Sequence, residues 1–155
     1  MKQTKTTKIA LVSILTALSV ALGYVVKIPT ATGILTFLDA GIFFTAFYFG
    51  RREGGIVGGL GGFLIDLISG YPHWMIFSLI FHGSQGYFAG FKGKWQWLGL
   101  VLASLVMVAG YAFATAWMKG WGQALADVPH NLVQNFVGML VGFLLCQSIT
   151  KIRKQ

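Results

Sequence analysis

Six long apolar stretches, separated by short polar segments, dominate the hydropathy pattern of the chain. Their limits are 8–26, 36–50, 54–69, 72–91, 95–118 and 129–150. The hydrocarbon core of a bilayer is about 30 Å thick, so one helical span requires about 20 mostly apolar residues. The second and third stretches are short, and we expect them to cross inside a bundle. The pattern predicts an all-α integral membrane protein with six transmembrane helices in one bundle, a single domain over residues 1–155.

The amino-acid composition supports the membrane assignment. The sequence is 55% hydrophobic and only 10% charged, whereas about a quarter of the residues of soluble proteins are charged. We therefore expect a multi-pass protein of the cell membrane. Lysines precede the first stretch as in a signal peptide, but this apolar run is too long for one, and an even number of spans requires it.

Basic residues fall mainly in the loops of one side of the predicted bundle. With both termini in the cytoplasm, most of the 12 Lys and Arg residues lie inside, as the positive-inside rule requires. The net charge of +8 then reflects topology and contact with anionic lipid, and it gives no reason to expect nucleic-acid binding. The inner set is Lys2, Lys5, Lys8, Arg51, Arg52, Lys92, Lys94, Lys151, Arg153 and Lys154, and the outer pair is Lys27 and Lys119.

Small residues at four-residue spacing mark two helix faces that can approach another helix closely. The first span has Ala10, Ser13, Ala17 and Ala21 on one face, and the third has Gly54, Gly58 and Gly62 with Gly55 and Gly59 beside them. We expect the glycine face to pack inside the bundle. For the first-span face, packing inside the bundle and docking on another membrane protein both remain open.

Polar side chains in the last three spans converge in the outer half of the bundle. Amide groups exposed to hydrocarbon are costly, so these side chains should line a cavity or hydrogen-bond with one another. The candidate binding residues are Trp74, Ser78, His82 and Gln85 in the fourth span, Tyr111 and Thr115 in the fifth, and His130, Asn131, Gln134 and Asn135 in the sixth. Ser104 lies on the same face of the fifth span.

Several polar residues have a structural alternative. His82 can form a buried hydrogen bond between helices, and His130 can be solvated at the membrane interface. Asp39 fits a capping box with Thr36 in the pattern T-x-x-D, which favours a structural role. Asp66, near the outer end of the third span, is expected to hydrogen-bond within the bundle, with a role in the binding site as the alternative.

Signatures of enzymes are absent from the sequence. It contains no G-x-x-x-x-G-K-[ST] phosphate loop, no H-E-x-x-H zinc motif and no G-x-S-x-G nucleophile motif. The chain is therefore not expected to hydrolyse ATP or to be an enzyme. No ligand spacing supports a metal site, and no cofactor is expected.

Four segments resemble, in their order, a known family of transporter subunits. They are ALVSILTALSVALG, KIPTATGILTFLDAG, FYFGRREGGIVGGLGGFLIDLISG and YPHWMIFSLIFHGSQGYFAGF. The chain resembles the substrate-binding S components of energy-coupling factor (ECF) vitamin transporters, particularly the riboflavin-transporter-like group. Their order, the size of the chain and the six-span layout support this resemblance, which extends over nearly the whole sequence.

The resemblance implies partners and a gate. It implies that the first helix docks through Ala17 and Ala21 on a transmembrane scaffold (T) subunit, and that two cytoplasmic ATPase subunits supply the energy. The loop 27–37 would act as a lid over a small-molecule vitamin that is held by the outer halves of the last three helices. Cobalt and nickel members bind metal through an N-terminal histidine, and the start MKQ argues against that branch.

The candidate residues indicate the kind of substrate. Aromatic rings can stack on a flat ligand, and amides can donate and accept hydrogen bonds. An anionic vitamin would require a cation, yet no Arg or Lys lies at that depth in the last three spans. We therefore favour a small, near-neutral heteroaromatic vitamin or precursor, such as pyridoxine or hydroxymethylpyrimidine, over the larger riboflavin.

Two other classes of protein remain as alternatives. A self-sufficient small secondary transporter would require an internal repeat or an ion-coupling acid near the midplane, and we find neither. A structural or regulatory membrane subunit would not require converging polar faces.

Overall fold

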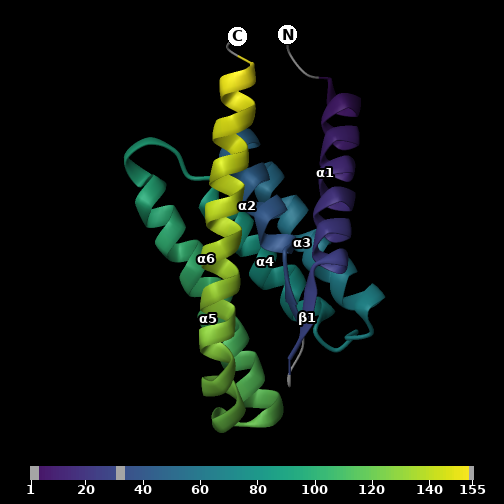
Figure 1. Cartoon of the computed structure of the whole chain (residues 1–155), viewed down its shortest axis with the longest axis vertical. Coiled ribbons are helices and arrows are strands. Elements are labelled where there is room, and N and C mark those ends of the chain that lie inside the picture. Colours follow the sequence, from purple (N-terminus) through teal and green to yellow (C-terminus); the bar gives the residue numbers. More distant parts are fainter. Residues whose placement is uncertain (1–3, 31–33, 154–155) are drawn as a thin grey trace.

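The computed structural model describes residues 4–30 and 34–153, which form six helices and a short hairpin (Figure 1). The helices are α1 (Lys5–Val25), α2 (Leu38–Phe49), α3 (Arg51–Ser69), α4 (Met75–Ala89), α5 (Gln96–Lys119) and α6 (Trp121–Ile152). A 3₁₀ turn, η1 (Gly93–Trp95), precedes α5, and strands β1 (Lys27–Pro29) and β2 (Ile34–Thr36) pair antiparallel between α1 and α2. The six predicted helices are confirmed, whereas the hairpin was not predicted.

The start of α1 and the end of α6 lie at one end of the bundle (Figure 1). The connection between α4 and α5, which contains Lys92 and Lys94, lies toward the same end, and the hairpin and the α5–α6 turn lie at the other (Figure 1). This is the arrangement that the proposed orientation requires. Lys2 and Lys154, which are also predicted on the inner side, lie outside the described residues.

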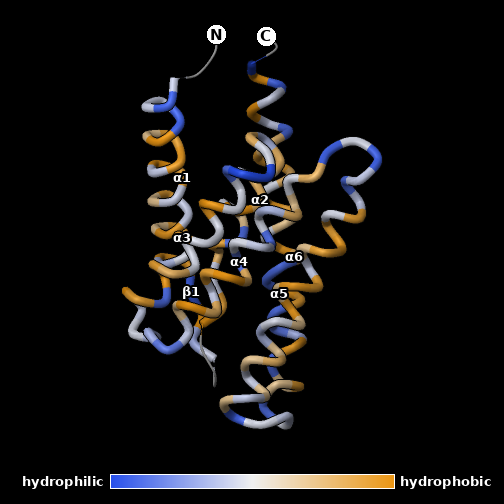
Figure 2. Tube along the Cα trace, turned by 180° about the vertical axis from the view of Figure 1, so that it is seen from behind, coloured by the Kyte–Doolittle hydropathy of each residue, from blue (hydrophilic) through white to orange (hydrophobic). Residues whose placement is uncertain are grey.

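Large apolar side chains cover much of the outside of the bundle, as a lipid environment requires. Ile14, Leu105 and Phe136 are each more than half exposed, and Figure 2 shows long hydrophobic runs along α1, α5 and α6. Three segments, Lys5–Val25, Gly93–Lys119 and Trp121–Ile152, are long and apolar enough to cross a membrane. Helix α2 has only 12 residues and packs against α1, α3, α4 and α6, so this short stretch lies inside the bundle as predicted.

The glycine face of α3 packs directly on the backbone of α4, which confirms the prediction of internal packing. The contacts pair Gly54 with Gly86, Gly58 with His82, and Gly62 with Ser78. At each of these α3 positions an added Cβ atom would come under 3.0 Å from a carbonyl oxygen of α4. Only glycine permits this approach, and it directs the polar stripe of α4 into the bundle.

Helix α6 uses glycine in the same way against α2. A Cβ atom at Gly138 would collide with the side chain of Asp39, and one at Gly142 would lie 2.7 Å from the Cβ atom of Phe43. The two backbones are therefore close, and Asp39 on α2 reaches the amides one turn earlier on α6.

The small-residue face of α1 does not pack against other described residues of this chain. Ala10, Ser13, Ala17 and Ala21 are exposed, while the opposite face of α1 is buried through Thr16, Ser19, Val20 and Gly23. Of the two alternatives for this face, internal packing is thus wrong. Docking on a partner stays a prediction.

The predicted start of the sixth span is wrong. Helix α6 begins at Trp121 and continues through Pro129, although proline favours the first turn of a helix because it lacks an N–H group. Transmembrane helices tolerate proline where neighbouring groups satisfy the freed carbonyl. The correction places Asp127 on α6, one turn before Asn131, so that both side chains lie on the same face.

The predicted capping box of α2 is absent. Phe37 is the N-cap residue without a side-chain cap, and the Thr36 hydroxyl accepts a hydrogen bond from the Leu38 backbone N–H at 3.3 Å. The Asp39 carboxylate is fully buried because polar side chains from α4 and α6 surround it. The structural role predicted for Asp39 is therefore performed in the bundle interior and not at the helix end.

Candidate binding site

A polar cavity with a volume of about 50 Å³ lies beneath the hairpin, at the end of the bundle opposite the start of α1 (Figure 1). Seven of the predicted residues line it, namely Trp74, His82, Tyr111, Thr115, His130, Asn131 and Gln134. The hairpin region contributes Thr30, Ile34, Leu35 and Thr36. Four residues of the predicted lid 27–37 therefore line the cavity, whereas residues 31–33 lie outside the described residues, and the function of the segment as a lid stays a prediction.

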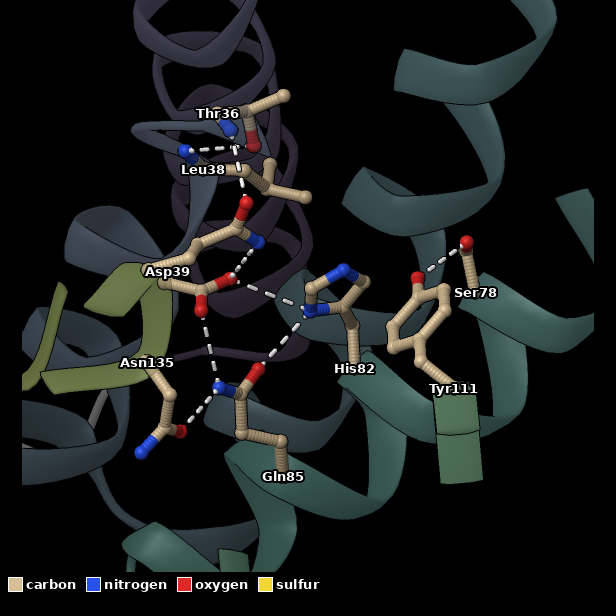
Figure 3. A network of polar contacts seen from close by, with 9 residues as sticks. Thr36, Leu38, Asp39, Ser78, His82, Gln85, Tyr111 and Asn135 are labelled. Carbon is tan, nitrogen blue, oxygen red and sulfur yellow. Dashed lines mark hydrogen bonds and ion pairs between the residues drawn. The ribbon is translucent and has the colours of Figure 1, made fainter. Parts of the chain in front are cut away.

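Aromatic rings form one wall of the cavity. The ring centroids of Trp74 and Tyr111 are 5.5 Å apart, and the Tyr111 ring also contacts Phe81 at 5.1 Å and His82 at 5.7 Å. A hydrogen bond between the Ser78 and Tyr111 hydroxyl groups fixes this ring (Figure 3). Ser78 thus orients the wall instead of lining the cavity.

A buried hydrogen-bond network supports the cavity from below, and the Asp39 carboxylate is its centre (Figure 3). Asp39 Oδ1 lies 3.3 Å from His82 Nδ1 and 3.5 Å from the donor Gln134 Nε2. Asp39 Oδ2 accepts a hydrogen bond of 3.2 Å from Gln85 Nε2. A buried carboxylate is strongly destabilising unless it is paired and hydrogen-bonded, and three side chains provide these partners.

The network determines which nitrogen of His82 holds a proton. His82 Nδ1 lies 2.9 Å from Gln85 Oε1 as well as next to Asp39 Oδ1. Both neighbours are acceptors, so Nδ1 must be the donor. The other ring nitrogen, Nε2, points away from both of these partners (Figure 3) and is a hydrogen-bond acceptor when the ring is neutral.

Gln85 and Asn135 belong to this network and do not line the cavity. Gln85 Nε2 donates to Asn135 Oδ1 at 2.9 Å, and Asn135 Nδ2 donates to Ser104 Oγ at 2.7 Å. The amide groups of Gln85 and Asn135 are thereby occupied by other side chains. These two predicted residues are placed to support the site from behind.

Gln134 connects the hairpin to the network. Its Oε1 accepts a hydrogen bond of 2.8 Å from the backbone N–H of Thr36, the last residue of β2. Its Nε2 faces the Asp39 carboxylate. One side chain of α6 therefore contacts both the hairpin and the buried carboxylate.

Two acidic residues that line the cavity were not among the candidate binding residues, although a role in the site was the alternative for Asp66. Asp66 and Asp127 are each only 6% exposed, and no Lys or Arg is among the described residues that line the cavity. The misplaced start of the sixth span hid Asp127. Both residues could have been found in the sequence, because an ionisable residue within or beside an apolar stretch indicates a functional site by default.

The whole-chain comparison decides the class of the protein. The model of the family "ECF-type riboflavin transporter, S component" matches residues 3–151. The chain belongs to the S components of ECF transporters. The S component is therefore a multi-pass membrane protein and a substrate-binding subunit for vitamin uptake, without enzymatic activity of its own. A substrate-binding subunit is not the purely structural subunit that remained as an alternative.

Two relatives and one solved structure are similar over most of the chain. The thiamine precursor transporter HmpT of Lactococcus lactis subsp. cremoris (strain MG1363) is 44% identical over 147 residues, which are 93% of this chain and 88% of HmpT. An uncharacterised protein of Pyrococcus woesei is 37% identical over 123 residues, 76% of this chain and 82% of that protein. A solved structure of the S component of a bacterial ECF transporter superposes with a TM-score of 0.77 at 21% identity, covering 98% of this chain and 100% of that one, and it supports the fold.

Proposed function

We propose that this S component binds hydroxymethylpyrimidine, a single-ring precursor of thiamine, and delivers it to the cytoplasm. The observation that supports this proposal is the small, acidic and aromatic cavity beneath the hairpin. The similarity of the chain to HmpT, whose name identifies it as a thiamine precursor transporter, points to the same substrate class.

The size of the cavity favours one ring. A water molecule requires roughly 10–15 Å³ of such volume, so the cavity of about 50 Å³ has room for about three to five water molecules. That space corresponds to one substituted six-membered ring. The fused three-ring system of riboflavin would require the hairpin to move away from α6.

The charge of the cavity favours a ligand that donates hydrogen bonds. The cavity is lined by two carboxylates, Asp66 and Asp127, and by His82, whose acceptor nitrogen is directed at the ligand in this proposal. No Lys or Arg is among the described residues that line it. Hydroxymethylpyrimidine carries an exocyclic amino group and a hydroxymethyl group, both of which donate. Pyridoxine, the second candidate from the sequence, offers hydroxyl groups but no amino group, and it fits this cavity less well.

The residues divide into three groups in this proposal. Trp74 and Tyr111 stack against the ring, and the polar cavity residues His82, Thr115, His130, Asn131 and Gln134 bind its edge. Ser78, Gln85 and Asn135 hold these groups in position. The whole chain, residues 1–155, acts as one substrate-binding domain.

Transport in this proposal requires an energy-coupling module. The exposed face of Ala10, Ser13, Ala17 and Ala21 docks on the scaffold subunit, to which two cytoplasmic ATPases attach, and both chain ends face the cytoplasm. Ala17→Leu should block co-purification with the scaffold by steric exclusion while ligand affinity stays within a few-fold. Unchanged co-purification would remove this face from the interface.

Binding to the purified protein tests the substrate directly. The full chain in lipid nanodiscs is titrated with hydroxymethylpyrimidine, pyridoxine and riboflavin, with total tryptophan fluorescence or calorimetry as the signal. Mass spectrometry of small molecules released from the protein identifies any ligand that co-purifies. We expect the tightest binding for hydroxymethylpyrimidine, and tighter binding of riboflavin would overturn the proposal.

A further inference from the structure

One carboxylate oxygen in the cavity has no hydrogen-bond partner in the described part of the chain. Among the described residues, the buried side-chain atoms without a hydrogen-bond partner are Asp66 Oδ2 and Ser69 Oγ. Asp66 is more than nine-tenths buried and lines the cavity. A buried acceptor without a partner loses its hydration and gains nothing in return, so this oxygen requires an explanation.

Helix stability does not explain the position of Asp66. It lies in the last turn of α3, where its own backbone carbonyl accepts hydrogen bonds from Gly70 and Tyr71. The C-terminal end of a helix has a partial negative charge, so a carboxylate is unfavourable there. Asp39, in contrast, has hydrogen-bonding partners on both of its carboxylate oxygens.

We propose that Asp66 is the residue that selects amino-substituted rings. Its oxygen Oδ2, which has no partner among the described residues, accepts a hydrogen bond from an N–H group of the bound ligand. The inference rests on the proposed function and adds the residue that determines specificity. A hydrogen bond to a charged acceptor is stronger than a neutral one, so this single contact has a large influence on which ring is bound.

The position of Asp66 predicts which of two closely related rings binds more tightly. An analogue of hydroxymethylpyrimidine with an oxo group in place of the amino group would direct a carbonyl oxygen at the carboxylate, and two acceptors repel each other. Sites that hydrogen-bond a substrate N–H reject analogues that lack it strongly, because a buried polar group is then left unpaired. Wild-type protein should therefore prefer the amino ring over the oxo ring.

The test compares these two ligands on three proteins. Asp66→Asn removes the charge and replaces one acceptor oxygen by a donor. Glu53→Gln is the matched control, because it makes the same change on the same helix at a distance of about 20 Å along its axis. We expect Asp66→Asn to bind the amino ring about 10- to 100-fold more weakly than wild type and to lose the preference over the oxo ring, while Glu53→Gln matches wild type.

The ratio of the two affinities is the decisive quantity, because it does not depend on the fraction of correctly folded protein. An unchanged ratio in Asp66→Asn overturns the inference, and so does a wild-type preference for the oxo ring, which would make Asp66 a donor. An equal loss of preference in Asp127→Asn also overturns it, since the overall charge of the cavity would then be sufficient.

Two further results separate the inference from the proposed function. If Asp66→Asn does not fold, the wild-type protein is titrated with the ring that lacks the amino group, and equal affinity for both rings overturns the inference. If wild-type protein binds neither the amino nor the oxo ring, the proposed function fails and the inference fails with it. Wild-type binding of the amino ring together with an unchanged Asp66→Asn variant refutes the inference alone.

Discussion

Two neighbouring regions of this protein contain the same kinds of polar side chain and use them differently. In the network below the cavity, Asp39, Gln85 and Asn135 are joined to other side chains by hydrogen bonds of 2.7–3.5 Å. In the cavity wall, Asp66 retains a carboxylate oxygen without a partner in the described structure, and the Nε2 atom of His82 points away from its bonded neighbours (Figure 3). Satisfied polar groups build the bundle, and unsatisfied ones are available to a ligand.

The largest expected difference between the two regions concerns their aspartates. Asp39→Ala leaves the donors of His82, Gln85 and Gln134 without their buried acceptor, and each buried donor left unpaired costs about 1–3 kcal/mol. Asp66→Ala removes a carboxylate with one unpaired oxygen and should lower the free energy of unfolding much less. Unfolding in mixed micelles with a denaturing detergent measures both values.

Melting curves with added ligand are the control for these two variants. Added hydroxymethylpyrimidine should raise the melting temperature of wild type but not of Asp66→Ala. Equal stability losses in the two variants would contradict the distinction between a structural and a binding carboxylate.

A smaller loss is expected where α2 and α6 touch behind the network. Gly138→Ala places a methyl group against the side chain of Asp39, and overpacking of this kind costs about 1–3 kcal/mol. Gly122→Ala on the same helix has no atom within 4 Å of the added Cβ and should be neutral or stabilise by up to about 1 kcal/mol. Melting curves of the two variants, measured side by side, show whether the close approach is essential.

The cavity wall and the buried network can also be compared within one turn of α6, at Asn131 and Asn135. Asn131 lines the cavity, so Asn131→Ala should weaken binding about 5- to 100-fold with little change in melting temperature. Asn135 donates to Ser104 and accepts from Gln85, so Asn135→Ala should lower the melting temperature first. Calorimetric titration beside a melting curve separates the two, and the opposite assignment would mean that the deeper amide contacts the ligand.

The sequence predicted those features that repeat along one helix. The glycine face of α3 and the stripe Trp74, Ser78, His82 and Gln85 follow the helical period, and the structure buries all four stripe residues. Helix existence was equally clear, because the apolar stretches are long.

Features that depend on distant partners were not predictable in the same way. Thr36 and Gln134 are 98 positions apart, and nothing local to either residue indicates their hydrogen bond. The hairpin strands have three residues each, too few for an alternating pattern to emerge. Asp127 was missed because Pro129 resembles a helix start, whereas only the packing of the bundle shows that the helix continues through it.

The smallest expected effect lies at the border between the two regions, where the hydroxyl groups of Ser78 and Tyr111 meet. Tyr111→Phe keeps the ring that faces the ligand and removes only this bond, and hydrogen bonds between membrane helices contribute about 0.6 kcal/mol on average and at most about 1.7. Ser78→Ala should cost a similar amount. The double variant should be little worse than either single one, because it leaves no hydroxyl group unpaired. Unfolding free energies of the four proteins give the coupling, and affinities within about fivefold of wild type would agree with a bond that orients the ring. Strictly additive losses would show that the two hydroxyl groups act independently, and a larger loss of affinity than of stability would place the Tyr111 hydroxyl group in direct contact with the ligand.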